Sequence, residues 1–152
     1  MKYATSSGMA ERARVALAVA LTLVAAVPAG AQSTAPLPID AAAQPLLGQW
    51  RITGIAGRPV VRGSGARLAL ADVRISGNTG CNTLGGNFRV ERGHLTTGGL
   101  ITSRRGCSPQ LMRQEKVLLD LLDQRLAVRQ SHRGRLILTA RDGRTLVLVR
   151  AT

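Results

Sequence analysis

The chain has 152 residues, a formal net charge of +13 at pH 7 and 45% apolar residues. This length predicts one domain, the apolar content is that of a globular protein, and no uninterrupted run of 18 apolar residues marks a membrane-spanning helix. Only 2% of the residues are aromatic, which excludes most base-stacking surfaces, and we expect no specific nucleic-acid binding.

Residues 1–31 have the composition of a secretory signal peptide. Three bases precede an apolar run from Val15 to Val27, and small residues at positions 29–31 suit cleavage after Ala31. The alternative is a membrane anchor, but a helix of that length spans about 20 Å of a hydrocarbon layer about 30 Å thick. No cysteine near the cleavage site offers a lipid attachment point. The sequence therefore predicts an exported, soluble protein, periplasmic or secreted, with no membrane span after cleavage.

Residues 32–45 are rich in Ala and Pro and predict a flexible leader, which places the domain at residues 46–151. Within the domain, apolar residues recur at every second position, the periodicity of strands. These pairs are Trp50 and Ile52, Leu68 and Leu70, Val73 and Ile75, Phe88 and Val90, Leu126 and Val128, and Leu136 and Leu138. Asp142-Gly143 is a hairpin turn before a last strand at 145–150.

The same alternation directs four arginines to the outer face of the strands: Arg51, Arg74, Arg89 and Arg129. All but one of the bases after residue 31 are arginines, spread singly along the chain rather than clustered. Arginines dispersed in this way are typical of a protein whose overall composition is rich in arginine, and they need no binding role. The pattern also leaves open a surface that attracts polyanions.

One segment has the periodicity of a helix near residues 109–123. Ser108 is suited to cap its N-terminus and Pro109 to its first turn. Leu111, Glu115 and Leu118 share one face, so we expect Glu115 to turn inward and to accept hydrogen bonds from an arginine or from the backbone of the Cys81–Asn82 turn. The alternative is a catalytic Glu115 acting with His94 or Ser103. No motif supports that alternative, and we expect no enzymatic activity.

Cys81 and Cys107 are the only cysteines, and in an exported protein they predict a disulfide. The alternative is a nucleophilic pair of a cysteine with His94 or His132, which has no motif around it. The spacing fits no metal site, and we expect no metal or cofactor.

The glycine-rich segment 80–86 resembles a phosphate-binding loop in spacing but lacks its Lys-Ser/Thr. A turn near the disulfide is the favoured interpretation. The Asn82 side chain can hold the backbone of such a turn by hydrogen bonds. The alternative is that it forms hydrogen bonds to a ligand.

Several of these elements resemble the META domain family, also called HslJ-like proteins. They are a Trp that opens the first strand (Trp50), Gly80-Cys81-Asn82, Gly86 followed by Phe88, a second cysteine at Cys107 and a helical Glu at Glu115. The resemblance covers about residues 46–150.

The resemblance implies a mainly β (α+β) fold, a small antiparallel β-barrel-like domain with one helix. It also implies an exported or envelope-associated protein, and some members are linked to heat shock and other stress. We therefore expect a non-enzymatic, monomeric binding or protective module of the cell envelope, whose partner is an envelope protein or an anionic ligand. The alternative is a polyanion-binding module that uses the outward arginines.

Overall fold

The computed structural model describes residues 43–131 and 134–152. The expected signal peptide, most of the expected leader and His132 lie outside the described residues. In chain order the elements are the 3₁₀ helix η1 (Gln44–Leu46), the strands β1 (Gly48–Ile55), β2 (Arg58–Pro59), β3 (Arg67–Ala71), β4 (Arg74–Asn78), β5 (Thr83–Glu91) and β6 (His94–Thr102), the helix α1 (Pro109–Leu122), and the strands β7 (Leu126–Gln130), β8 (Arg135–Thr139) and β9 (Thr145–Arg150).

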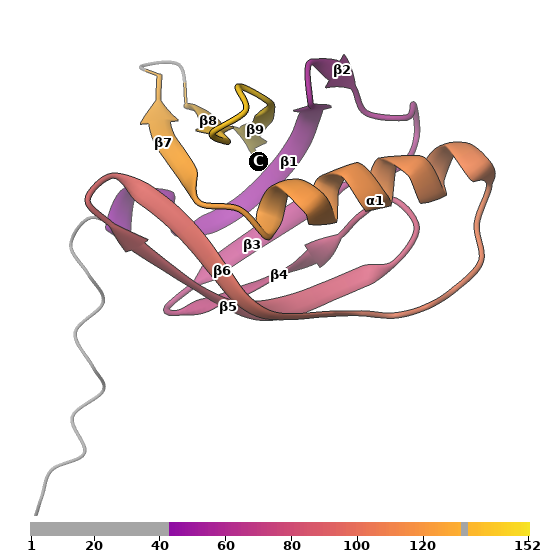
Figure 1. Cartoon of the computed structure of the whole chain (residues 1–152), viewed down its shortest axis with the longest axis horizontal. Coiled ribbons are helices and arrows are strands. Elements are labelled where there is room, and N and C mark those ends of the chain that lie inside the picture. Colours follow the sequence, from indigo (N-terminus) through magenta and orange to yellow (C-terminus); the bar gives the residue numbers. More distant parts are fainter. Residues whose placement is uncertain (1–42, 132–133) are drawn as a thin grey trace, which may run out of the picture. The chain divides into compact units, whose positions relative to one another are not determined.

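The strands form one antiparallel sheet that closes on itself (Figure 1). The order is β2-β1-β3-β4-β5-β6-β7-β8-β9, and a further pairing of β1 with β9 joins the two sides into an eight-stranded barrel. The short β2 pairs only with β1, outside the closed ring. In the described part of the chain α1 is the only α-helix, so the predicted β-barrel with one helix is confirmed.

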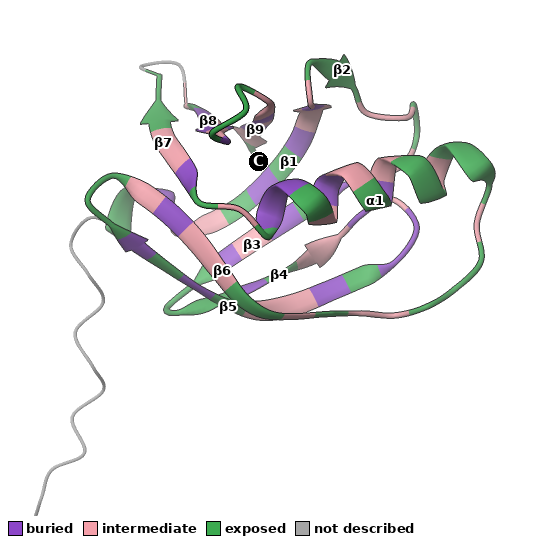
Figure 2. Cartoon of the chain, viewed as in Figure 1, coloured by how far each residue is buried: buried purple, intermediate pink, exposed green. Residues whose placement is uncertain are grey.

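The core consists of the inward residues of the strands together with one face of α1. Exposed and buried residues alternate over positions 49–52 of β1, and Figure 2 shows the burial along the strands. Trp50 is completely buried, its Nε1 donates to the Leu46 carbonyl at 2.7 Å, and the Arg150 guanidinium lies 4.5 Å from its ring centre. Ala43 and Leu46 are buried as well. The packed structure therefore begins slightly before the predicted boundary at Leu46.

The four arginines predicted on the outer face are all exposed, as the alternation requires. The prediction that Val73 faces the core beside Ile75 is wrong. Its side chain is 54% exposed, because Ala71 pairs with Arg74 and leaves Asp72 and Val73 as the two residues of a tight turn. Asp72 takes a positive φ of 52° there. Alternation cannot show where a strand begins, and here β4 begins one residue after Val73.

The helix α1 begins and ends where the sequence predicts. The Ser108 side chain accepts a long hydrogen bond from the Leu111 N–H at 3.5 Å, and Asp123 is the C-cap residue. At the other end, Thr97 Oγ1 of β6 donates to the Leu122 carbonyl at 2.6 Å, which holds the helix C-terminus against the sheet. Among the described residues, no helix has the length and apolarity needed to cross a bilayer.

Candidate functional site

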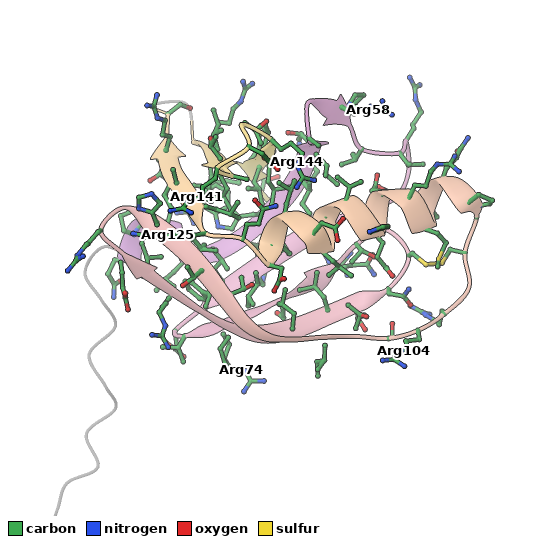
Figure 3. The ribbon with its side chains drawn as sticks, viewed as in Figure 1. Arg58, Arg74, Arg104, Arg125, Arg141 and Arg144 are labelled. Carbon is green, nitrogen blue, oxygen red and sulfur yellow. A yellow bond between two sulfur atoms is a disulfide. The ribbon has the colours of Figure 1, made fainter. Side chains whose placement is uncertain are left out.

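The turn between β4 and β5 (residues 79–82, the GCN turn) joins the barrel to α1. Cys81 forms the predicted disulfide with Cys107, with an S–S distance of 2.03 Å and a Cα–Cα distance of 5.9 Å. This bond ties the turn to the segment that enters the helix. The turn lies at the end of the molecule where the disulfide is drawn in yellow in Figure 3.

Glu115 turns inward from α1 toward this turn, as predicted, but its partners differ from those predicted. Thr79 Oγ1 donates to Glu115 Oε2 at 2.5 Å, and Asn82 Nδ2 donates to Glu115 Oε1 at 3.0 Å. No arginine in the described residues forms a salt bridge with Glu115. The expected arginine or backbone donors are therefore replaced by two neutral side chains, because the helix positions Glu115 over side chains of the turn.

Asn82 is the centre of the hydrogen-bond network and is 1% exposed. Besides Glu115, its Nδ2 donates to the Arg105 carbonyl at 3.2 Å. Its Oδ1 accepts from the Arg105 N–H at 2.8 Å and from Ser103 Oγ at 2.9 Å. One buried amide thus connects the turn, the helix and the segment between β6 and α1.

Gly80 is required at its position by both conformation and space. Its φ is +101°, which side chains rarely allow, and a Cβ there would lie 2.7 Å from Gln114 Nε2 and 2.8 Å from the Ser64 Cβ. The helix approaches this closely because Gln114 Nε2 donates to the Thr79 carbonyl at 2.7 Å. A Cβ at Gly86, next to a β-bulge in the β5–β6 pairing, would lie 2.9 Å from the Leu100 side chain.

The backbone N–H groups of Gly80, Cys81 and Asn82 donate to side chains of the GCN turn and of Asn78, the residue before it. The Gly80 N–H donates to Asn78 Oδ1 at 2.7 Å, and the Cys81 and Asn82 N–H groups donate to Thr79 Oγ1 at 3.2 and 2.9 Å. A phosphate-binding loop needs such groups free to face the ligand. The turn interpretation therefore holds for residues 80–82, whereas residues 83–86 belong to β5, with a β-bulge at Gly86. The Asn82 side chain has its hydrogen bonds within the protein.

Of the residues in the catalytic alternative, the structure brings Ser103 and Glu115 to the same turn but places His94 elsewhere. Ser103 and Glu115 both contact Asn82, which separates the hydroxyl from the carboxylate. His94 instead contacts the Arg92 carbonyl and Arg125, through Nδ1 at 2.9 and 3.3 Å. Figure 3 shows Arg125 at the end of the molecule opposite the disulfide.

Around His94 the surface is hollowed and basic. One hollow of about 560 Å³ is lined by Glu91, Arg92, His94, Thr96 and Arg125, and an adjoining one of about 240 Å³ by His94, Arg125, Ala127, Thr139, Ala140 and Arg141. They share His94 and Arg125 and are called the His94 hollow below. Nearby in the β8–β9 turn, hydrogen bonds from the Arg144 N–H and side chain hold the pKa of Asp142 below its usual value.

Glu115→Gln is expected to lower the free energy of unfolding by about 1–3 kcal/mol. If the new amide group faced Asn82 Nδ2, two donors would oppose each other, and Asn82 cannot turn because its Oδ1 already accepts two bonds. If the amide faced Thr79 Oγ1, it would meet an oxygen that already accepts two N–H groups. Urea unfolding of the wild type and the variant measures the difference.

Gln110→Glu serves as the control, because it alters an exposed carboxamide on the same helix. We expect it to change the stability by no more than about 0.5 kcal/mol. Equal stability of Glu115→Gln and the wild type would show that the carboxylate is not held as the contacts indicate.

Comparison with known proteins agrees with this architecture. The META domain family model matches residues 44–152. A solved NMR structure of a protein from Burkholderia xenovorans is 26% identical, with a TM-score of 0.61 over 85% of this chain and 99% of that one. A second NMR structure, 23% identical, has a TM-score of 0.60 over 71% of this chain and 92% of that one, which shows the shared fold. The search of curated proteins found no match. Because the family model covers well over half of the chain, this protein belongs to the META domain family.

Proposed function

We propose that this protein is exported and serves as a non-enzymatic binding or protective module of the cell envelope under stress. The observation that carries export is the Cys81–Cys107 disulfide, since such bonds persist in oxidising compartments and are rare in the cytosol. The signal-like composition of residues 1–31 supports the same compartment. The stress role rests on the family resemblance.

A non-enzymatic role is supported by the use of the polar groups in the GCN turn. A catalytic acid or base needs a free lone pair or proton facing a substrate. Glu115 is 9% exposed, and both of its oxygens accept hydrogen bonds from the turn. Among the described residues, no group of three or more His, Cys, Asp or Glu gathers as a metal site would require.

The polyanion alternative depends on whether arginines from different strands share one face. Figure 3 shows Arg58, Arg74 and Arg104 at separate places around the domain, whereas Arg125 and Arg141 lie close together. Arg58, Arg74 and Arg104 are therefore dispersed, whereas Arg125 and Arg141 line one hollow. This arrangement favours one local basic site over a continuous polyanion-binding band.

A pull-down from the envelope fraction tests the main proposal. We expect the tagged protein to retain a discrete envelope protein at a salt concentration that releases polyanions. The Cys81→Ser/Cys107→Ser variant, which lacks the disulfide, is the control for fold integrity. Recovery of polyanions alone, removed by salt, would favour the electrostatic alternative. A measured turnover abolished by Glu115→Gln would overturn the non-enzymatic role.

A further inference from the structure

The His94 hollow is formed by three neighbouring strands at one end of the barrel. The pairing places His94 of β6 beside Ala127 of β7, and Ala127 beside Thr139 of β8. Leu95 and Leu126, the next pair, are buried, so this row lies on the outer face. Ala127 and Thr139 are small, which leaves space between the longer side chains around them.

Three arginines from different segments surround this row. Arg92 comes from the β5–β6 turn, Arg125 from the residue before β7, and Arg141 from the β8–β9 turn. Their convergence requires the barrel, since 49 positions of sequence separate the first from the last. Figure 3 shows Arg125 and Arg141 near each other.

The positive charge in the hollow is largely uncompensated. No salt bridge joins Arg92, Arg125 or Arg141 to any acid of the described residues. Glu91 is the one lining carboxylate, and it lies 3.6 Å from the guanidinium of Arg89, which does not line the hollow.

His94 leaves Arg125 without an acceptor. The Arg92 carbonyl can only accept, so the tautomer that satisfies this shorter contact, at 2.9 Å, is the one with the proton on His94 Nδ1. A protonated Nδ1 cannot also accept from Arg125 Nη2 at 3.3 Å. The Arg125 guanidinium therefore lies beside the hollow without a hydrogen bond to His94, and its N–H groups can donate to an external acceptor.

From this geometry we propose that the His94 hollow is a binding site for a phosphate group. Arginine forks match the oxygens of a phosphate in pairs, and each of the two adjoining hollows is bordered by two of them, Arg92 with Arg125 in the larger and Arg125 with Arg141 in the smaller. The hydroxyl groups of Thr96 and Thr139 are further donors in the lining. The site is independent of the GCN turn and of the proposed envelope role. A soluble phosphorylated molecule and an anionic lipid headgroup would both present this chemistry.

An NMR titration with inorganic phosphate tests the site on the protein as isolated from its host. We expect saturable shifts of the backbone N–H signals of His94, Thr96, Ala127 and Thr139. Arg125→Gln/Arg141→Gln should weaken the binding at least about tenfold, because two of the three cations are removed. Arg58→Gln on β2 lines neither hollow and should change it less than about twofold.

The Arg92→Asn variant distinguishes a loss of phosphate binding from a loss of folding. Arg92 and Gly93 both have positive φ in a two-residue turn, 51° and 74°, and Asn is preferred over Arg in that conformation. The variant should keep the fold and its thermal midpoint while weakening phosphate several-fold. Shifts without saturation, or equal weakening by Arg58→Gln, would overturn the proposal.

Vesicles of phosphatidylglycerol, with neutral phosphatidylcholine vesicles as control, distinguish the two sources of phosphate. If the anionic vesicles bind, compete with inorganic phosphate and lose binding in Arg125→Gln/Arg141→Gln, the ligand is a headgroup. Saturable phosphate binding without competition by vesicles supports a soluble ligand. Failure of all phosphate probes would remove this site and leave the proposed envelope role standing.

Discussion

Replacing Cys81 or Cys107 with serine is expected to lower the thermal midpoint of unfolding by more than about 10 °C. The two cysteines are 26 positions apart, and a closed loop of that length contributes about 3.5 kcal/mol in the chain-entropy model. For a domain of about 100 residues, each kcal/mol shifts the midpoint by roughly 4–8 °C. Differential scanning calorimetry of the oxidised wild type and the variants measures the shift.

The double variant Cys81→Ser/Cys107→Ser is the matched control, because either single change already removes the bond. We expect its midpoint to lie close to those of the single variants. The bond is checked separately by mass spectrometry after treatment with a thiol-blocking reagent, which should add no mass unless the protein is first reduced. Modification of both cysteines without reduction would contradict the disulfide in the isolated protein.

Asn82→Ala is expected to destabilise the domain by roughly 3–5 kcal/mol, because it removes several buried hydrogen bonds at once. Glu115 Oε1 loses the Asn82 Nδ2 donor, and the Arg105 N–H and carbonyl lose their partners. A carboxylate left with one neutral donor in a buried place is costly. Chemical unfolding with the disulfide intact isolates this loss from that of the covalent bond.

Asn87→Ala is the control, since it removes the same side chain at an exposed position of β5 and should cost less than about 0.5 kcal/mol. A double-mutant cycle of Asn82→Ala with Glu115→Leu then measures the coupling between turn and helix. We expect the double variant to be more stable than the sum of the two losses predicts, by at least about 1 kcal/mol. Strict additivity would mean that the two side chains do not support each other.

The local elements could be predicted because each depends on residues close together in the chain. Alternating apolar residues indicate a strand whichever strand it pairs with, and Ser108-Pro109 begins α1 through its own first turn. The disulfide also followed from sequence, since the chain has only two cysteines. Val73 shows the limit, because the register between β3 and β4 decides whether such a residue is in a strand or a turn.

The hydrogen-bond donors to Glu115 could not be predicted from the residues close to it in the sequence. The sequence indicated a buried carboxylate near the GCN turn, and abundant arginines suggested an ion pair. The structure supplies Thr79 and Asn82 in their place, and Gln114 beside them reaches the Thr79 carbonyl. Which donor meets a carboxylate depends on how far the helix is rotated and advanced over the barrel, and no local pattern records this.

By itself, then, the sequence determined the strands, the helix with its inward Glu115, the disulfide and the resemblance to META domains. Only the tertiary structure decided which arginines share a site. Arg92, Arg125 and Arg141 look alike in the sequence among many single arginines, and none has a motif. They meet at His94 because the register of β6, β7 and β8 brings three chain segments to one end of the barrel, and register is set by pairing between distant residues.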